Sequence, residues 1–440
     1  MITESKKVII KKLNSDLTGS GFLNEKEFYF SYVLPEDEVI FETFGRGKRK
    51  FNKVYSIISN HDSIAKCNYF GKCGGCKAQH IDYKLQFQLK TKPIIDFYKS
   101  NFDLNLKTIS NKDIYSYRNR MDFSVFPDEI GLRQEGNFRK VIDIDHCMIQ
   151  KDIANQELMI LRKILNPIIR YNRKLETGFL KYVTLRTSQN GKELMSILTF
   201  SESFRNTQEE SELKEIILQN SIANSILFCY TRMKSEVSAQ GEFEVIRGTS
   251  TLKEVILGQV FEIPFDGFFQ PNPNGFLPIL KFIEESIHDN RYNTLIDLFS
   301  GLGFFSLLFG ERFMNVYGFD VVDSSIEKAN LLLKNKFPKK RIHFYKMDLI
   351  SETLQFKSYG VNEKESILIL DPPRNGIGNK VISILENSEI SKIFYVSCNP
   401  NSQLKDIMDM KSYKPIDGLI VDPYPHTPHL ESVMLLEKIN

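Results

Sequence analysis

Four short apolar runs in the C-terminal part of the chain constrain its fold more than any other feature. They are TLIDLF, NVYGFD, ILILD and KIFYVS, and segments with helical spacing separate them. Apolar runs of this kind suit strands that are buried on both faces of a sheet. Because these runs alternate with helices, they predict an α/β fold with a parallel, doubly wound, Rossmann-like sheet over residues 261–440.

Two further domains are expected before this sheet. Residues 1–60 contain alternating runs such as FYFSYV and DEVIFETF, with turns at Gly19 and Gly21, and predict a small β-barrel. Residues 61–260 mix strand-like and helical runs and predict an α+β domain. Near its start, YKLQFQLKTKPIIDFYKS has helical spacing that Pro93 interrupts. A length of 440 residues agrees with two or three domains.

Composition narrows the class of protein. Apolar residues make up 42% of the chain and charged residues 26%, which is the balance of a soluble globular protein. No run approaches the length of a membrane-spanning helix, and the N-terminal MITESKKVIIKK lacks the apolar core of a signal peptide. We therefore expect a cytoplasmic protein with no membrane partner, and we take it to be a monomer.

One short segment is strongly basic although the formal net charge is only +3. It contains Arg46, Lys48, Arg49, Lys50 and Lys53. The run alone favours a solvated loop, and the other interpretation is contact with phosphates.

The six cysteines are better explained as ligands, nucleophiles or core residues than as disulfides, because the expected compartment is reducing. Cys67, Cys73 and Cys76 are spaced C-x5-C-x2-C in a segment too irregular for a helix, and Cys147 lies in VIDIDHCMIQ. Four thiolates suit zinc or an iron–sulfur cluster, and the spacing leaves both open. Cys229 has no such partner and is expected in the core.

The segment TLIDLFSGLGFFSLLF indicates a strand, a turn with Gly301 and Gly303, and an apolar helix. Ligands of an open parallel sheet bind beyond the carboxyl ends of its strands, and glycines let the backbone approach them. The turn lacks the third glycine of the dinucleotide motif, so it is weak support by itself. Phe299 and Phe304 are candidates to flank an adenosine, although such residues more often belong to the core.

Two acids in register behind this turn strengthen the case for a cofactor. Asp320 ends the next strand, where an acid can accept hydrogen bonds from both hydroxyls of a ribose. Asp348, after IHFYK, is placed to accept a hydrogen bond from an adenine amino group. The alternative for each acid alone is a helix N-cap or a turn residue. Their shared register favours the ligand interpretation.

Two reactive side chains are expected at adjacent strand ends that face this cofactor. Asp371 follows ILIL and is held by two prolines, and Cys398 follows KIFYVS. A lone cysteine is more often a small buried residue, but this placement favours a nucleophile. Glu431 opens the last strand among apolar neighbours, where burial would suit it to act as a base. His426 and His429 are rivals for that role, although hydrogen-bonded turn residues explain them better.

These groups match one reaction. C5 of uracil is too weak a nucleophile to take a methyl group directly, but a thiolate that adds to C6 makes C5 able to attack a sulfonium methyl. A base must then remove the C5 proton so that the thiolate can leave. Cys398 and Glu431 supply the nucleophile and the base, and Asp371 can read the edge of the uracil. Phe268 or Phe269 in GFFQPN can stack on a base flipped out of a duplex.

Together these motifs resemble the bacterial RNA uracil-5-methyltransferases, and most closely the iron–sulfur-containing 23S ribosomal RNA (uracil-5-)-methyltransferases. The resemblance implies a class I S-adenosylmethionine-dependent methyltransferase domain behind a TRAM-like RNA-binding barrel and a central iron–sulfur domain. SCNP makes Cys398 the nucleophile and PHTPHLE makes Glu431 the base, while FFQPN makes Phe268 the stacking aromatic. DPPRNG also places Asp371 at the substrate. The residues implied as cofactor contacts are Gln270, Phe299, Phe304, Asp320, Asp348 and Asp371.

The resemblance also implies that the four cysteines of the pattern hold a [4Fe–4S] cluster. Their spacing differs from that of radical enzymes, so the cluster would be structural or would contact RNA. Two residues depart from the family: the position of Phe304 varies among relatives, and Asp320 stands where relatives often have the longer glutamate. The tRNA uracil-54 enzymes generally lack the cysteine pattern, although some archaeal ones have it. The expected substrate is therefore 23S rRNA, with tRNA as the alternative.

Two other classes stay open. An exocyclic-amine nucleic-acid methyltransferase uses a similar proline turn but needs no thiol, so Cys398 argues against it. An RNA-binding or electron-transfer iron–sulfur protein with a degenerate cofactor fold would differ by failing to bind S-adenosylmethionine.

Overall fold

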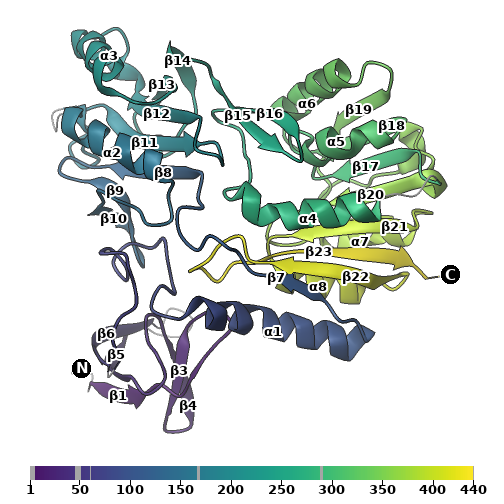
Figure 1. Ribbon diagram of the computed structural model, residues 1–440, viewed down its shortest axis with the longest axis horizontal. Helices are drawn as coiled ribbons and strands as arrows, with labels where there is room; N and C mark the ends of the chain where they lie inside the picture. The colour runs from purple at the N-terminus through teal and green to yellow at the C-terminus, as the bar shows by residue number, and fades with distance from the viewer. Residues whose placement is uncertain (1–4, 45–50, 60, 166–168, 288–290, 440) are drawn as a thin grey trace. The chain divides into compact units, whose positions relative to one another are not determined.

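Two compact units make up the chain in the computed structural model, which describes residues 5–44, 51–59, 61–165, 169–287 and 291–439 (Figure 1). The first unit comprises Met1–Leu89, Lys112–Asn274 and Tyr424–Pro428, and the second comprises Lys90–Asn111, Gly275–Pro423 and His429–Asn440. The segment Lys90–Asn111 precedes much of the first unit in sequence. It belongs to the second unit because its strand β7 (Lys107–Ile109) pairs with a strand of that unit's sheet.

The N-terminal region of the first unit forms two small antiparallel sheets that share one core. Their orders are β1-β5-β6 and β2-β3-β4, with strands β1 (Lys6–Ile9), β2 (Lys12–Leu13), β3 (Gly19–Leu23), β4 (Lys26–Phe30), β5 (Glu38–Phe44) and β6 (Phe51–Ile58). Gly19 and Gly21 lie within β3, so the turns predicted at these residues are wrong. A Cβ atom on Gly21 would lie 2.2 Å from the carbonyl oxygen of Ile9. Glycine therefore serves close packing between β1 and β3, which the local sequence does not reveal.

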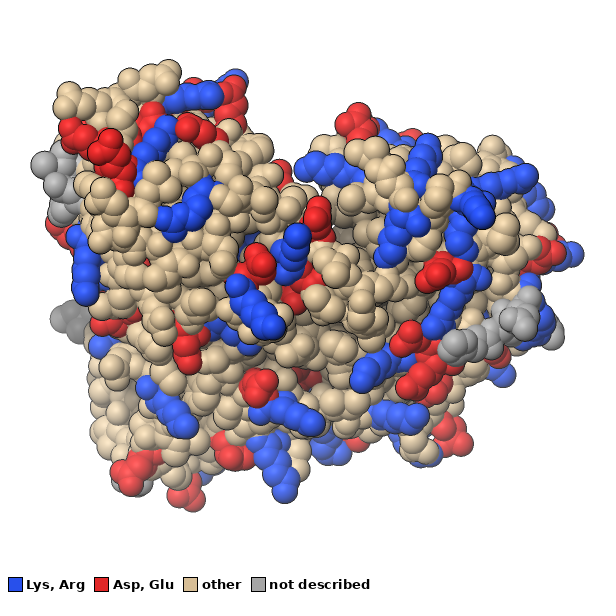
Figure 2. Space-filling model, turned by 45° about the horizontal axis from the view of Figure 1, so that its top comes forward, with Lys and Arg blue, Asp and Glu red and all other residues tan. Residues whose placement is uncertain are grey.

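Charged side chains of both signs are interspersed on the face of the molecule shown in Figure 2, in keeping with the small net charge. Of the basic run, Lys53 lies in β6 and its Nζ lies 5.0 Å from the centre of the Tyr55 ring. The other four members, Arg46, Lys48, Arg49 and Lys50, lie outside the described residues.

The remainder of the first unit is built on a seven-stranded sheet of order β10-β9-β8-β11-β12-β13-β14. Its elements are β8 (Arg120–Val125), β9 (Ile130–Gln134), β10 (Asn137–Asp143), α2 (Asp152–Ile164), β11 (Leu180–Thr187), β12 (Leu194–Ser201), α3 (Gln208–Asn220), β13 (Ser225–Thr231) and β14 (Glu242–Arg247). Strands β11, β12 and β13 are buried along their whole length. A hairpin of β15 (Thr251–Ile256) and β16 (Gln259–Pro264) follows. Cys229 is buried in β13, as expected of a core residue.

The second unit carries an eight-stranded sheet of order β19-β18-β17-β20-β21-β23-β22-β7 (Figure 1). Besides β7, its elements are α4 (Pro273–Ser286), β17 (Thr294–Leu298), α5 (Phe304–Phe309), β18 (Asn315–Asp320), α6 (Asp323–Lys336), β19 (Arg341–Lys346), β20 (Ser366–Leu370), α7 (Gly378–Glu386), β21 (Lys392–Ser397), α8 (Pro400–Asp409), β22 (Tyr413–Val421) and β23 (Glu431–Lys438). Strands β17 to β21 are parallel, and β17 and β20 are buried throughout. The predicted doubly wound α/β sheet is therefore confirmed. Strand β23 runs antiparallel between β21 and β22.

Helix α1 (Tyr83–Phe102) runs without a break through Pro93, so the predicted interruption there is wrong. Proline removes one backbone hydrogen bond from a helix. Burial of Ile94 and Tyr98 in the core of the second unit compensates for that loss. None of the described helices has the length and apolar character needed to cross a bilayer.

Candidate active site and cysteine pocket

Two candidate catalytic residues, Cys398 and Glu431, and the candidate binding residue Asp371 lie at one edge of the second unit's sheet. Asp371 directly follows β20, and Cys398 directly follows the neighbouring parallel strand β21. Strand β23 begins with Glu431 and pairs antiparallel with β21, with Ser397 opposite Ser432. One further step along this register sets Cys398 opposite Glu431, and opposite residues in such a pair have Cα atoms about 4.5–5.5 Å apart. Strand pairing thus brings a thiol and a carboxylate together from distant parts of the chain.

The electrostatics of this edge favour a protonated thiol. Cys398 is half-buried, and burial raises the pKa of its thiol. The negative charges of Glu431 and Asp371 raise the pKa of Cys398 further, and Arg374 partly opposes them. Because the thiolate is the reactive form, a nucleophile here has to lose its proton when the substrate binds.

Asp371 can act as both a donor and an acceptor near neutral pH. Desolvation of its carboxyl raises the pKa of Asp371 to about 7, although the residue keeps some exposure. A carboxyl that is partly protonated can donate one hydrogen bond and accept others. The edge of uracil presents an N–H donor between two carbonyl acceptors, so such a group is suited to it.

The glycine turn after β17 adopts a conformation that matches its residues. Gly301 and Gly303 have φ angles of +52° and +77°, and Gly303 is the N-cap of α5. A Cβ atom on Gly303 would lie 2.9 Å from Cδ1 of Leu333, so the turn also packs tightly against α6. Phe299 and Phe304 are both half-buried at its two ends. Phe299 has a φ of +60°, an uncommon conformation for an aromatic residue.

Asp320 holds this turn through backbone amides. Its Oδ2 accepts a hydrogen bond from the Gly301 N–H at 2.9 Å, and its Oδ1 accepts one from the Val322 N–H at 2.9 Å. These contacts agree with the alternative interpretation of Asp320, that of an acidic residue that stabilises a turn. A carboxylate has about four lone-pair sites, so Asp320 can also receive ribose hydroxyls.

Asp348 makes similar local contacts. It accepts hydrogen bonds from the Ile350 N–H at 3.0 Å and from the Ser351 hydroxyl at 2.6 Å. The Ser351 hydroxyl is the main reason why the pKa of Asp348 lies below its usual value. Asp348 is therefore ionised at neutral pH and remains a hydrogen-bond acceptor.

Phe268 and Gln270 belong to the first unit, in the segment after the β15–β16 hairpin. Asn119 Nδ2 donates to the Gln270 carbonyl at 3.1 Å, and the buried guanidinium of Arg186 donates to three carbonyls within residues 264–267. Phe268 is 77% exposed. Such exposure is unusual for an aromatic residue in a segment whose backbone is fixed by hydrogen bonds. Its ring is available to stack on a ligand.

The two histidines differ in their surroundings. His426 is buried in the first unit, where its Nδ1 lies 3.2 Å from Nε2 of Gln86 and its ring packs 4.8 Å from that of Tyr115. His429 is half-buried in the second unit. The contacts of His426 agree with the expected hydrogen-bonded turn residue.

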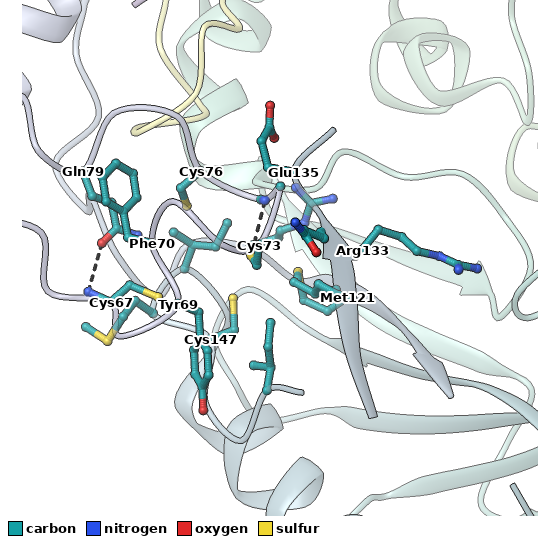
Figure 3. A pocket seen from close by; sticks show the side chains of 18 of the residues that line it. Cys67, Tyr69, Phe70, Cys73, Cys76, Gln79, Met121, Arg133, Glu135 and Cys147 are labelled. Atoms are coloured by element: carbon teal, nitrogen blue, oxygen red, sulfur yellow. Dashed lines mark hydrogen bonds between the residues drawn. The ribbon is translucent and has the colours of Figure 1, made fainter. Parts of the chain in front are cut away.

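In the first unit, the four pattern cysteines line one cavity of about 550 Å³ (Figure 3). The members are Cys67, Cys73, Cys76 and Cys147. The Gly75 N–H points at Sγ of Cys73 at a distance of 3.4 Å. Burial raises the pKa of Cys73 to about 11 and that of Cys76 to about 12, so both are protonated at neutral pH.

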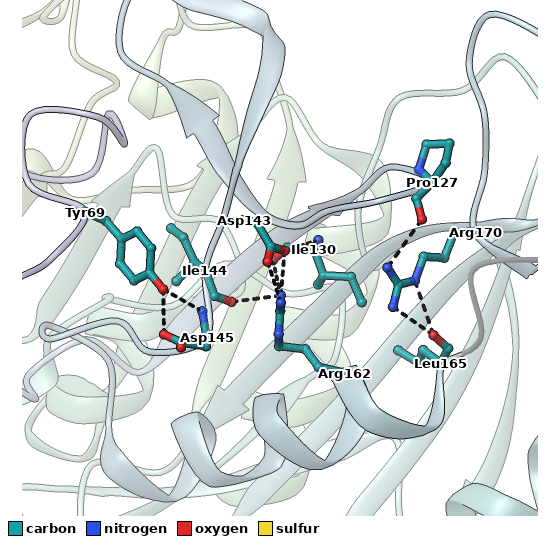
Figure 4. A network of polar contacts seen from close by, with 9 residues as sticks. All are labelled: Tyr69, Pro127, Ile130, Asp143, Ile144, Asp145, Arg162, Leu165 and Arg170. Carbon is teal, nitrogen blue, oxygen red and sulfur yellow. Dashed lines mark hydrogen bonds and ion pairs between the residues drawn. The ribbon is translucent and has the colours of Figure 1, made fainter.

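Polar contacts join the two loops that carry these cysteines (Figure 4). Tyr69, between the first two cysteines, donates its hydroxyl to Oδ1 of Asp145 at 2.6 Å. Arg162 on α2 pairs with Asp143 through both carboxylate oxygens and also donates to the Ile144 carbonyl at 3.1 Å. The segment that leads to Cys147 is thus held from both sides.

The donor set of this pocket fits a thiolate-bound group. Four sulfurs around one cavity suit zinc or an iron–sulfur cluster, and N–H groups directed at sulfur are typical of cluster sites. Across the described residues, no group of three or more His, Cys, Asp or Glu side chains is gathered closely enough to hold a metal ion as it stands. Binding would therefore draw the sulfurs together and release their protons.

Comparison with known proteins identifies the family. The sequence model of the tRNA (uracil-5-)-methyltransferase family matches residues 82–439. The chain belongs to this family. Membership makes it an S-adenosylmethionine-dependent RNA uracil-5-methyltransferase, as the sequence analysis expected, and it sets aside the two other classes.

Three relatives extend over almost the whole chain. An uncharacterized RNA methyltransferase of Leptospira interrogans is 43% identical and covers 98% of this chain and 96% of its own length. The tRNA (uracil(54)-C(5))-methyltransferase of Pyrococcus horikoshii is 30% identical over 97% of this chain and 99% of its own. The crystal structure of the Pyrococcus abyssi tRNA (uracil-54, C5)-methyltransferase with S-adenosyl-L-homocysteine is 26% identical. It has a TM-score of 0.76 and covers 98% of this chain and 100% of that one.

Two further residues, Asp297 and Asn399, form hydrogen bonds that support the turns around the site, and neither was predicted from the sequence. Asp297 is fully buried in β17, accepts hydrogen bonds from the Ser306 N–H and hydroxyl, and has its pKa raised to about 7 by burial. It is a lone acid inside an apolar run, which was a usable signal. Asn399 donates to the Arg374 carbonyl at 3.0 Å and so ties the turn after β21 to the turn after β20.

Proposed function

We propose that this family member methylates C5 of a uridine through a covalent adduct, with Cys398 as the nucleophile and Glu431 as the base. S-adenosylmethionine supplies the methyl group and is released as S-adenosylhomocysteine. The Cys398 sulfur adds to C6 and forms a C–S bond, which makes C5 nucleophilic. After methyl transfer, Glu431 accepts the C5 proton, and the C6–S bond breaks to restore the ring and the thiolate. The observation that carries this proposal is the pairing of Ser397 with Ser432, after which Cys398 and Glu431 are the next two residues in register.

The remaining site residues are assigned to binding. Asp371, with its raised pKa, reads the edge of the uracil, and the exposed Phe268 stacks on the flipped base. Asp320 binds the ribose hydroxyls and Asp348 binds the adenine amino group of the cofactor. Further contacts to the cofactor are assigned to Gln270, Phe299, Phe304 and Asp371.

We propose tRNA as the first candidate substrate. The cysteine pattern favours 23S rRNA. However, the tRNA uracil-54 enzymes of Pyrococcus horikoshii and Pyrococcus abyssi match nearly the whole chain. 23S rRNA is the second candidate substrate, because the four pattern cysteines line one pocket.

The test is methylation of unmodified transcripts of tRNA and 23S rRNA with labelled S-adenosylmethionine. We expect 5-methyluridine in tRNA, mapped by mass spectrometry of nuclease fragments, and little or none in 23S rRNA. Product in 23S rRNA alone would reverse the choice of substrate. Label at any position other than C5 of uracil would overturn the proposed reaction.

We further propose that the four pattern cysteines hold a [4Fe–4S] cluster. Protein purified without oxygen should contain about four irons and four sulfides per chain. Cys73→Ala should lose most of both, because it removes one of the four thiolates. Cys229→Ala, which changes a buried cysteine outside the pocket, should keep them. Stoichiometric zinc without sulfide would contradict the cluster.

Three functional regions are proposed: residues 1–60 as a TRAM-like RNA-binding barrel, residues 61–260 as the cluster domain and residues 261–440 as the methyltransferase domain. The segment Lys90–Asn111, within the second range, belongs to the second unit and adds β7 to its sheet. Support for the first comes from two small sheets around one core. Exposed aromatic residues, among them Phe22 and Tyr55 with Lys53 over its ring, provide stacking surfaces beside positive charge. Cytoplasmic location and a monomeric state stay predictions.

A further inference from the structure

A fully buried ion pair that the proposed reaction does not use lies within the second unit. Nζ of Lys90 on α1 is 2.6 Å from Oδ2 of Asp422, and both side chains have 0% exposure. Burial lowers the pKa of Lys90, and the charge of Asp422 opposes that effect. Burying two charges is costly, and apolar residues of similar size often serve stability equally well. The pair therefore calls for an explanation beyond stability.

Lys90 holds both ends of one loop. Asp422 directly follows β22, and Nζ of Lys90 also donates to the carbonyl oxygen of His429 at 3.3 Å. His429 lies two residues before Glu431, the first residue of β23. The pairing of Val421 with Glu431 brings the same two chain ends together. One ammonium group thus joins the end of β22 to the start of β23, over the loop of residues 422–429.

Helix α1 also holds the middle of this loop. One turn before Lys90, Gln86 accepts a hydrogen bond from the His426 N–H at 3.0 Å, and its Nε2 lies 3.2 Å from Nδ1 of His426. The side chains of Gln86 and Lys90 on α1 are both buried. The path of the loop into Glu431 is therefore determined by α1, and not only by the pairing of β22 with β23.

We propose that Lys90 is a positioning residue for Glu431, which keeps the carboxylate opposite Cys398 for removal of the C5 proton. This inference rests on the proposed function, because it assigns Lys90 to the step that Glu431 performs. It makes a specific claim: loss of the pair slows elimination, while addition of the thiol and methyl transfer continue.

The test is the double variant Lys90→Met/Asp422→Asn, which removes both charges and keeps the side chains close to their original size. Elimination should slow by roughly 10²-fold, the scale of a catalytic group displaced by about 1 Å. A covalent protein–RNA adduct that already carries the methyl group should therefore accumulate, visible as a shifted band on a denaturing gel. The readout is the amount of covalent adduct divided by the amount of protein that binds S-adenosylmethionine. Partial unfolding does not change this ratio, because unfolded protein contributes to neither amount.

The matched control is Lys92→Met/Asp96→Asn on the same helix. It removes an exposed ion pair with the same change of charge, and it should turn over without adduct. The reference is Glu431→Gln, which should accumulate adduct. If Lys90→Met/Asp422→Asn does not bind S-adenosylmethionine, Lys90→Gln/Asp422→Asn, which leaves no unpaired charge, is measured by the same criterion.

The outcomes separate the two proposals. Adduct in the Lys90 variant and in Glu431→Gln supports both. Adduct in Glu431→Gln alone, with normal turnover or uniform loss of activity in the Lys90 variant, overturns the role of Lys90 and leaves the proposed function intact. Absence of adduct in Glu431→Gln overturns Glu431 as the base, and the positioning role of Lys90 fails with it.

Discussion

Cys398→Ala should abolish both methylation of RNA and the covalent bond between protein and RNA. Without the sulfur, nothing adds to C6, and C5 stays too weak a nucleophile to attack the methyl group. We expect activity to fall by roughly 10⁴-fold or more, the scale of removing a catalytic nucleophile. Transfer of labelled methyl to RNA and a denaturing gel for the adduct measure the two effects.

The control for this variant has to separate chemistry from folding. Cys398→Ala should bind S-adenosylmethionine as the unmodified protein does, because a half-buried thiol at a strand end contributes little to the core. Cys229→Ala changes a cysteine that is buried in the first unit, and it should keep activity. A fully active Cys398→Ala enzyme would remove the nucleophilic mechanism, and with it the physical reason for reaction at C5.

Glu431→Gln should stop the reaction one step later. The variant keeps the shape of the side chain and loses the base, so addition and methyl transfer proceed while the C5 proton stays in place. A methylated covalent adduct should therefore accumulate to nearly one equivalent, and turnover should be lost. Mass spectrometry of the cross-linked peptide identifies both the methyl group and its link to Cys398.

The histidines provide the comparison for this experiment. If Glu431 is the base, Glu431→Gln should trap the adduct more completely than His429→Gln or His426→Gln. A trapped adduct in a histidine variant, with none in Glu431→Gln, would transfer the role to that histidine. Glu431→Gln has a second expected effect. The negative charge of Glu431 raises the pKa of Cys398, so the loss of this charge in the variant should lower the pKa of Cys398. Alkylation of Cys398, followed over pH by mass spectrometry, should then begin at lower pH than in the unmodified protein.

The local sequence pattern predicted the parallel strands of the second unit well, and it predicted the structure around single glycine and proline residues less well. The runs TLIDLF, NVYGFD, ILILD and KIFYVS correspond to β17, β18, β20 and β21, because strands buried on both faces have to be apolar. The errors at Gly21 and Pro93 have a common origin. Both residues disrupt regular structure locally, and both are retained because tertiary packing outweighs that tendency. In one case a neighbouring backbone leaves no room for a Cβ atom, and in the other the helix buries Ile94 and Tyr98.

The candidate site divides in the same way. The chemical groups could be predicted from the sequence, because each lies in a short contiguous motif: a thiol and an acid after successive strands, a glycine turn with acids in register, and the cysteine pattern. How these groups combine depends on contacts between segments that are far apart in the chain. The antiparallel insertion of β23 beside β21 sets Glu431 opposite Cys398, and α1 contributes Lys90 to a loop more than 300 positions further along the chain. Burial then raises the pKa values of Asp297 and Asp371. The desolvation of a single carboxyl and the pairing of β23 with β21 both depend on residues that are far apart in the sequence.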